Sequence, residues 1–360
     1  MNIIKLYGLR VSYYTGKMEG YLRYKGIDYD FMPMNYGIFD LIEEKTGAAQ
    51  MPAIELTDGR FMADTTPMIA WFEEHHPEHS VYPKDPVMNV IAQLLEDYFD
   101  EWLWRPAMHY RWSYPQSRMH LSRRIVDEFM TDVKTPKFIM RAVIRRRQWG
   151  RFVKDDGVSL ETWDHVESIY LNTLERLQRV FANRPYLLGD KPSIADFGLF
   201  ASMFRHFAQD PTASDLMRLH ASGVFEWQAR LWNERADGEA DWINEIPDDL
   251  SPFLTDIGEA YLPYLSDNAR AWQQGLEHFD HQTQGVQYRH VPVSQYRVWC
   301  LEELQRKARA VGVQEQARLQ QVLSAQGCWE PLFELDDPGS RYDGASVPFK
   351  ATKVHYDNRH

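Results

Sequence analysis

Residues 50–72 constrain the fold of this chain more than any other segment, because they read as strand, tight turn, strand and helix. Residues 51–56 alternate in polarity, an Asp-Gly turn follows, and residues 60–63 form the returning strand. Asp64, with two threonines after it, stands where a residue can cap a helix. Pro52 is unusual, since a proline at the start of a strand cannot donate to the ladder. The segment therefore predicts a β-hairpin that leads directly into a helix, with Pro52 in a special role.

The residues before this hairpin predict an alternation of strands and helices. Residues 3–9 form an apolar strand, residues 18–25 read as a helix that stops at a glycine, and residues 28–34 read as a second strand. A polar, hydroxyl-rich loop is expected at residues 10–17 and another helix at residues 39–46. The expected order is strand, helix, strand, helix, hairpin and helix, which is a βαβ unit joined to a ββα unit.

In this order of elements the chain resembles the N-terminal thioredoxin-like domain of the glutathione S-transferase superfamily. Residues 12–17 stand where the family keeps its thiol-activating loop. Residues 50–52 resemble the family's loop and cis-proline, in which the residue before the proline pairs by main chain with the cysteinyl unit of glutathione. The following Asp-Thr pair resembles the acidic-hydroxyl pair that holds the γ-glutamyl end. The resemblance implies glutathione as a co-substrate, bound by Gln50, Met51, Pro52, Asp64 and Thr65.

The residue types in this pattern suit the two charges of the γ-glutamyl group. A protein carboxylate at a helix N-terminus can pair with the ligand's ammonium, while free N–H groups and a hydroxyl can donate hydrogen bonds to the ligand's carboxylate. Met51 departs from the family, which usually has valine there, but only the backbone of this residue would be used. The resemblance covers residues 1–265.

Catalysis in this family means stabilising the glutathione thiolate. A free thiol has a pKa of about 8.5, so lowering it by about two units requires roughly 2.7 kcal/mol of preferential stabilisation. A hydroxyl at a helix N-terminus supplies much of this through a hydrogen bond to the sulfur and through the helix dipole. The candidate catalytic residues are Ser12, Tyr7, Tyr13 and Tyr14.

Ser12 is the favoured candidate, because serine-type and cysteine-type members carry their functional residue just before the first helix. Tyr7 lies nearer the position that tyrosine-type members use, although a tyrosine at a strand end is more often packed. Tyr13 or Tyr14 could swing over the sulfur, and a further alternative is that no side chain activates the thiol. Because residue 12 is not a cysteine, reduction of disulfides through a mixed disulfide is disfavoured.

Helical patterns dominate the rest of the chain. Prolines within residues 77–86 indicate a linker after a thioredoxin-like, glutathione-binding domain at residues 1–80. An all-helical domain is expected at residues 87–265, with an insertion at about residues 105–157. Residues 266–360 form an extension that is helical and then an extended tail. The predicted fold class is therefore an α/β thioredoxin-like domain followed by an all-α domain.

The helical domain contains one strong local motif. Ser193 and Asp196 have the spacing of a capping box, in which each side chain satisfies the backbone N–H of the other. The surrounding residues 187–197 resemble the helix-initiating motif of the family's C-terminal domain. Residues 87–104 are expected to form the first long helix of this domain.

The helical domain would also supply the site for the electrophile. Aromatic side chains crowd into residues 98–114, and the candidate pocket residues are Trp102, His109, Tyr110 and Trp112. They offer enough flat apolar surface to receive an aromatic substrate. A well-packed helix core explains the same residues, so both interpretations stay open.

Charge and composition exclude several classes of protein. A formal net charge of -12 argues against nucleic-acid binding, which needs a basic face. We expect no membrane segment, because no apolar run approaches the roughly 18 residues that a membrane helix needs. Two cysteines suit a reducing compartment, so a cytoplasmic location is expected. Residues 73–79 are rich in Glu and His but lie near a helix end, and no metal site is expected.

We therefore expect a transferase that adds the glutathione thiolate to a hydrophobic, aromatic electrophile. The alternatives are a glutathione-binding interaction module without catalysis, and an enzyme that cleaves aryl ethers, since residues 64–66 are similar to those of such members. The resemblance also implies a homodimer. The extension could cover the second domain, close over the active site or bind a partner, and the tail residues Tyr342 and His355 could line the pocket.

Overall fold

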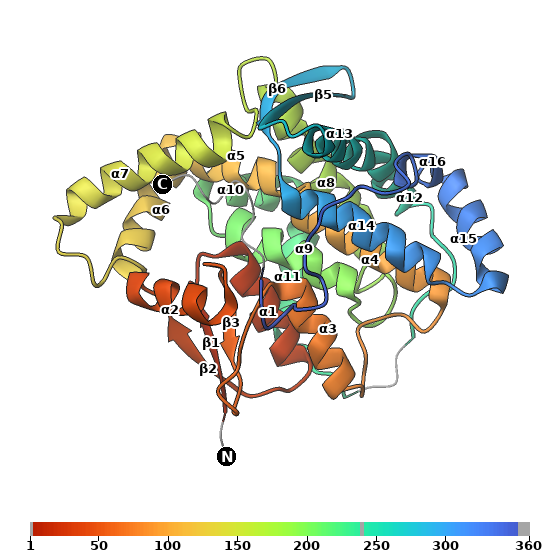
Figure 1. Cartoon of the computed structure of the whole chain (residues 1–360), viewed down its shortest axis with the longest axis horizontal. Coiled ribbons are helices and arrows are strands. Elements are labelled where there is room, and N and C mark those ends of the chain that lie inside the picture. Colours follow the sequence, from red (N-terminus) through yellow and green to blue (C-terminus); the bar gives the residue numbers. More distant parts are fainter. Residues whose placement is uncertain (1–2, 238–240, 352–360) are drawn as a thin grey trace.

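The computed structural model describes residues 3–237 and 241–351, in which a small sheet is joined to a larger body of helices (Figure 1). The sheet has four strands in the order β2-β1-β3-β4. β1 (Ile4–Gly8) pairs in parallel with β2 (Tyr29–Pro33) and antiparallel with β3 (Ala53–Glu55), and β3 pairs antiparallel with β4 (Phe61–Ala63). This sheet confirms the predicted thioredoxin-like arrangement, including the hairpin with its Asp-Gly turn.

The first helix begins earlier than the sequence predicts. The expected polar loop at residues 10–17 is wrong beyond Ser12, because α1 (Tyr13–Tyr24) starts immediately after it. Ser12 caps this helix, since its hydroxyl oxygen accepts a hydrogen bond from the backbone N–H of Thr15 at 3.4 Å. The polar residues that follow are buried, and Lys17 is fully enclosed. Their polarity therefore reflects contacts inside the protein and not exposure to water.

Two further helices complete the first domain. α2 (Tyr36–Thr46) is capped by the side chain of Asn35, and α3 (Thr65–His75) follows β4 after a single residue, Asp64. Both were predicted, although α2 starts before the expected residue 39. The strands and helices of this domain thus follow the βαβ and ββα order that the sequence indicates.

In the helical part, the first predicted helix is interrupted. The helix expected at residues 87–104 ends at Glu101, and a new helix starts at Trp104. The other elements described up to residue 273 are helices joined by loops, and three of them are short π-helical turns. These elements are α4 (Pro86–Glu101), α5 (Trp104–Trp112), α6 (Pro115–Glu128), α7 (Lys137–Trp149), η1 (Gly150–Lys154), α8 (Trp163–Asn183), α9 (Ile194–Ser202), η2 (Met203–Phe207), α10 (Pro211–His220), α11 (Ser222–Asn233), α12 (Ser251–Asp256), η3 (Ile257–Tyr261) and α13 (Leu262–Gln273).

Within its described residues, which end at 351, the extension adds a hairpin and three helices. The hairpin of β5 (His278–Thr283) and β6 (Val286–Pro292) was not predicted, whereas α14 (Gln295–Arg309) and α15 (Val313–Ala325) lie in the part of the extension that was expected to be helical. α16 (Trp329–Leu332) precedes the tail, which returns to the sheet domain (Figure 1). There, the backbone N–H of Ala63 donates to the carbonyl of Pro348 at 2.9 Å. Across the described ranges, no helix combines the length and apolarity needed to traverse a bilayer.

The predicted capping box at the start of α9 is confirmed. Ser193 and Asp196 form it, and both residues are fully buried. The Asp196 carboxylate also accepts the backbone N–H of Leu187 at 2.9 Å and the indole N–H of Trp227 at 3.3 Å. Burial raises the pKa of Asp196 to about 6. One side chain therefore satisfies several buried donors at the centre of the helical domain.

Replacing Asp196 with alanine should destabilise the protein by roughly 3 kcal/mol, because several buried donors would lose their acceptor. Urea denaturation followed by circular dichroism measures the change in the free energy of unfolding. The control Asp190→Ala removes an exposed carboxylate nearby and should change that free energy by less than about 0.5 kcal/mol. Equal effects of the two substitutions would contradict this role of Asp196.

Candidate functional site

Three loops of the sheet domain meet at one edge of the sheet. The strand register places Tyr7 of β1 opposite Ala53 of β3, and Ala53 opposite Ala63 of β4. β3 runs antiparallel to both neighbours, so the end of β1, the start of β3 and the end of β4 lie side by side. The loop before α1, the loop before β3 and the residue before α3 therefore converge here, and this edge is the candidate site.

The loop before β3 brings a cis-proline and a buried amide to this edge. The Met51–Pro52 peptide bond is cis, as the resemblance implied. The side-chain oxygen of Gln50 is buried and has no hydrogen-bond partner in the described part of the chain. A buried acceptor without a partner is costly, and a ligand that donates to it removes this cost. Gln50 therefore has the chemistry of a ligand-binding residue.

Asp64 contributes a second unsatisfied acceptor. It precedes α3 with φ 73°, a conformation that non-glycine residues adopt at a cost of about 1–3 kcal/mol, and its side chain does not cap the helix. One carboxylate oxygen, Oδ1, accepts a hydrogen bond from the hydroxyl of Tyr296 at 3.3 Å. The other, Oδ2, is buried without a hydrogen-bond partner among the described residues. Burial raises the pKa of Asp64 to about 7, against the opposing influence of Lys17.

Ser12 stands at the third corner of the edge. It is half-buried at the N-terminus of α1, where the helix dipole and the first N–H groups favour a negative charge. The preceding loop is anchored to the helical domain, since Arg111 donates from Nη1 to the carbonyl of Val11 at 2.7 Å and Arg205 donates to that of Arg10 at 3.3 Å. The backbone just before Ser12 is therefore held by side chains of the helical domain.

The three candidate tyrosines differ in where their hydroxyls point. Tyr7 donates to Glu55 at 2.7 Å, and Glu55 pairs with Lys5, so this hydroxyl points along the sheet and away from the edge. Burial and its contact with Glu55 raise the pKa of Tyr7 to about 12. Tyr13 is buried and donates to the carbonyl of Phe99 at 2.7 Å.

Tyr14 is the tyrosine that remains half-buried beside Ser12. Its hydroxyl donates to Glu101 Oε1 at 3.2 Å, and its ring stacks on that of Trp104 with 6.0 Å between centroids. Trp104 is itself half-buried and stands at the start of α5. The sequence marked this aromatic region but did not separate Trp104 from its neighbours.

The predicted pocket residues lie inside the helical domain. Trp102, His109, Tyr110 and Trp112 are all buried. His109, for example, contacts Glu167 at 3.3 Å through Nε2 and Ser113 at 2.9 Å through Nδ1, and burial lowers its pKa. Trp102 packs edge-on against tyrosines of η3 and α13. As substrate-binding residues, these four stay a prediction.

A buried charge cluster lies directly beneath the site. Lys17 of α1 contacts Glu96 Oε1 at 2.5 Å and also pairs with Asp100, both on α4, and it donates to Thr66 of α3 at 2.9 Å. Although burial opposes its charge, the carboxylates of Asp100 and Glu96 raise the pKa of Lys17 above its usual value. Although burial also opposes the charge of Glu96, Lys17 favours the ionised carboxylate and the pKa of Glu96 is lowered. The cluster joins three helices that border the site.

Lys17→Met should destabilise the protein by about 3–5 kcal/mol, because Glu96 and Asp100 would be left buried without a counter-charge. The free energy of unfolding from urea titration measures this. The matched control Lys45→Met removes an exposed lysine paired with Glu44 and should cost less than about 1 kcal/mol. A loss below about 1 kcal/mol for Lys17→Met would show that the cluster does not hold the helices together.

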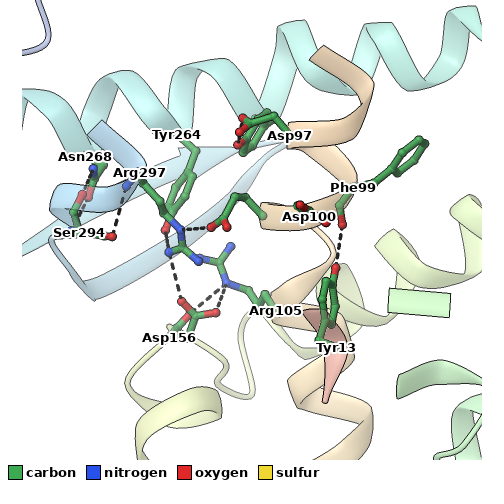
Figure 2. A network of polar contacts seen from close by, with 12 residues as sticks. Tyr13, Asp97, Phe99, Asp100, Arg105, Asp156, Tyr264, Asn268, Ser294 and Arg297 are labelled. Carbon is green, nitrogen blue, oxygen red and sulfur yellow. Dashed lines mark hydrogen bonds and ion pairs between the residues drawn. The ribbon is translucent and has the colours of Figure 1, made fainter. Parts of the chain in front are cut away.

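The extension supplies site residues that sequence reasoning missed. Tyr296 contacts Asp64, and the next residue, Arg297, donates to Glu101 at 3.3 Å. Figure 2 shows Arg297 within the polar network of α14, α13 and α4. Of the two predicted tail residues, Tyr342 stacks on Trp299 of α14, with 4.7 Å between the ring centroids. The other, His355, lies outside the described residues. In the sequence, only the aromatic pair Tyr296 and Trp299, three residues apart at the start of a helix, could have pointed to this contact.

A separate cleft lies elsewhere in the extension. It has a volume of about 380 Å³ and is lined by residues of α13 and of the β5–β6 hairpin, among them Asp267, Arg270 and His278. Its lining residues come from residues 267–290 alone. It is therefore distinct from the sheet edge at Ser12 and Asp64, where the unsatisfied acceptors lie.

Comparison with known proteins gives matches to both parts of the chain. Residues 6–80 match the family of glutathione S-transferase N-terminal domains, and residues 149–222 match the family of glutathione S-transferase C-terminal domains. Among solved structures, the chain is similar to the beta-etherase LigF from Sphingobium sp. strain SYK-6, at 19% identity and TM-score 0.45 over 64% of this chain and 95% of that one. It is also similar to a glutathione S-transferase from Rhodospirillum rubrum F11, at 18% identity and TM-score 0.42 over 70% and 92% of the two chains.

Proposed function

Because this chain belongs to the glutathione S-transferase superfamily, we propose that it is a transferase that binds glutathione at the sheet edge and stabilises its thiolate. The observation that carries the proposal is the pair of buried acceptors without partners, Gln50 Oε1 and Asp64 Oδ2, beside the cis-proline. Both lie in the segments whose resemblance to the family implies glutathione binding. The residues proposed to bind it are Gln50, Met51, Pro52, Asp64 and Thr65.

Each end of the ligand has a group that suits it. Asp64 would receive the ammonium of the γ-glutamyl group, and the first N–H groups of α3, which begins at Thr65, would receive the adjacent carboxylate. Gln50 would accept a hydrogen bond from a ligand N–H through its unsatisfied oxygen. The backbone of Met51 is proposed to pair with the cysteinyl unit.

Ser12 is proposed to activate the thiol. Its hydroxyl would donate a hydrogen bond to the sulfur, and the N-terminus of α1 would favour the negative charge. The thiol proton leaves to water, and the thiolate then forms a carbon–sulfur bond with the electrophile. In a substitution the leaving group departs with its bonding electron pair; in an addition the π electron pair of the attacked double bond moves to the neighbouring atom, which takes a proton from water. Tyr14 is the second candidate, because it is half-buried beside Ser12, whereas the hydroxyls of Tyr7 and Tyr13 are engaged away from the edge.

A hydrophobic, aromatic electrophile fits the half-buried ring of Trp104, which stacks on Tyr14. Tyr14 is two residues from Ser12 in the chain and is the residue against which Trp104 stacks, which supports Trp104 as a surface for the electrophile. The homodimer and the cytoplasmic location remain predictions.

Ultraviolet difference titration of the purified protein with glutathione across pH tests the proposal directly. Thiolate absorbance that develops well below the free thiol's pKa of about 8.5 would support the transferase. Binding without ionisation would instead favour an interaction module. Absence of binding would refute the glutathione site and leave the fold unaffected.

Asp64→Asn should weaken glutathione binding by about 10- to 100-fold, since the ligand ammonium would lose its charged partner. Wild-type affinity should also fall as the pH drops below about 7, because Asp64 then takes up a proton and loses the charge that binds the ammonium. Isothermal titration calorimetry measures both effects. The control Asp58→Asn makes the same charge change on the exposed hairpin turn and should leave affinity unchanged. Unaltered affinity in Asp64→Asn would remove Asp64 from the site.

Ser12→Ala should leave glutathione affinity within about threefold of the wild type but raise the pKa of the bound thiol by about one unit, because one charge-assisted hydrogen bond is lost. The ultraviolet titration measures this pKa. Tyr14→Phe is the matched comparison. If only Tyr14→Phe raises the thiol pKa, the activating hydroxyl is Tyr14 and the assignment to Ser12 is wrong.

A further inference from the structure

The first turn of α14 places two consecutive side chains at the candidate site. Tyr296 donates to Asp64 Oδ1 at 3.3 Å, and Arg297 donates from Nε to Glu101 Oε2 at 3.3 Å. Glu101 accepts the hydroxyl of Tyr14 through its other oxygen at 3.2 Å. One turn of the extension therefore reaches both Asp64 and the tyrosine beside Ser12.

We propose that Tyr296 is a positioning residue of the glutathione site, whose hydroxyl holds one oxygen of Asp64 so that the other is presented to the ligand ammonium. This inference rests on the proposed function. It assigns a role in that site to the extension, which lies outside both matched domains. Tyr296 acts through Asp64 and is not itself proposed to touch the ligand.

The hydrogen-bond arrangement of Asp64 supports this role. Oδ1 is engaged by Tyr296, while Oδ2 is buried and has no hydrogen-bond partner within residues 3–237 and 241–351. When a neutral donor fixes one oxygen of a carboxylate, the second oxygen has a defined direction. Oδ2 is therefore the oxygen that remains for a single incoming cation.

Tyr296 is itself held in place by packing. Its ring lies 5.5 Å from that of Trp299 and 6.2 Å from that of Tyr342, measured between centroids. The start of α14 is fixed to α13, because the backbone N–H of Ser294 donates to Asn268 at 2.8 Å and Asn268 donates back to the carbonyl of Ser294 at 2.8 Å (Figure 2). The hydroxyl is therefore directed at Asp64 by the fold of the extension.

The charged groups around Asp64 set the direction of the expected effect. Lys17 of α1 favours its ionised form, Glu96 and Glu101 of α4 oppose it, and the hydroxyl of Tyr296 favours it. Cys300 of α14 also faces this group, and burial raises the pKa of its thiol well above the usual range, so it adds no charge near neutrality. Removing the Tyr296 hydroxyl should therefore raise the pKa of Asp64 further.

The opposite possibility is that Tyr296 covers Asp64 and competes with the ligand. The two roles predict opposite signs. A positioning residue strengthens binding, and its loss weakens binding most at pH values at which Asp64 is partly protonated. A competing residue weakens binding, and its removal would tighten binding at every pH.

Calorimetric titration of the full-length Tyr296→Phe variant with glutathione, between about pH 6 and about pH 8.5, distinguishes them. We expect binding about tenfold weaker than wild type near pH 6 and nearly equal near pH 8.5, because the substitution raises the pKa of Asp64 by about one unit. Trp299→Phe, which alters the same aromatic cluster without touching the bond to Asp64, should show no pH-dependent loss. Circular dichroism confirms that both variants fold.

Each other result contradicts the inference. Tighter binding by Tyr296→Phe would identify a competitor, and equal affinity at every pH, alongside a large loss in Asp64→Asn, would overturn the role of Tyr296 while the glutathione site stands. An equal loss at all pH values in Tyr296→Phe and Trp299→Phe would show a packing role only. Failure of the wild-type protein to bind glutathione would overturn the proposed function and this inference together.

Discussion

One buried ammonium group, that of Lys17, joins the sheet domain to the helical domain beneath the site. It belongs to α1, whereas its partners Glu96 and Asp100 belong to α4. An ammonium buried without partners is too costly to keep, so α1 reaches its position only when α4 packs against it. α4 is fixed in turn by α9, where a Cβ at Gly198 would lie 2.8 Å from the carbonyl oxygen of Glu96. The loops at the sheet edge therefore take their positions from a charge cluster that neither domain can complete alone.

Local signals explain which parts of the fold the sequence could predict. The Asp-Gly hairpin, the helix after Asp64 and the capping box at Ser193 each depend on residues within a few positions of one another. The start of α1 was missed because its polar residues look solvated in sequence. Lys17 finds its partners 79 and 83 residues further along the chain, and no local pattern contains that information.

The same distinction separates the two halves of the candidate site. Loops at the ends of adjacent strands meet once the strand order is known, so Asp64 and the cis-proline could be placed from sequence. Tyr296 lies 232 residues from Asp64 and could not. For Trp102 and its aromatic neighbours, helical spacing indicates which side chains share a face. It does not indicate whether that face meets another helix or a ligand, and here the side chains are buried.

The charges around Asp64 determine which ligand group the edge can accept. Lys17 is already shared by Glu96 and Asp100, and Arg297 is engaged with Glu101, so carboxylates outnumber cations here. Burial and the neighbouring carboxylates raise the pKa of Asp64 to about 7, so Asp64 is largely protonated below that pH. An incoming ammonium would replace that proton as the counter-charge, whereas a ligand bringing only a carboxylate would add to the repulsion. A ligand that carries both charges is accepted only if its cation faces Asp64 and its anion faces a helix N-terminus. If glutathione is the ligand, as proposed, that requirement fixes the direction in which its γ-glutamyl group would enter.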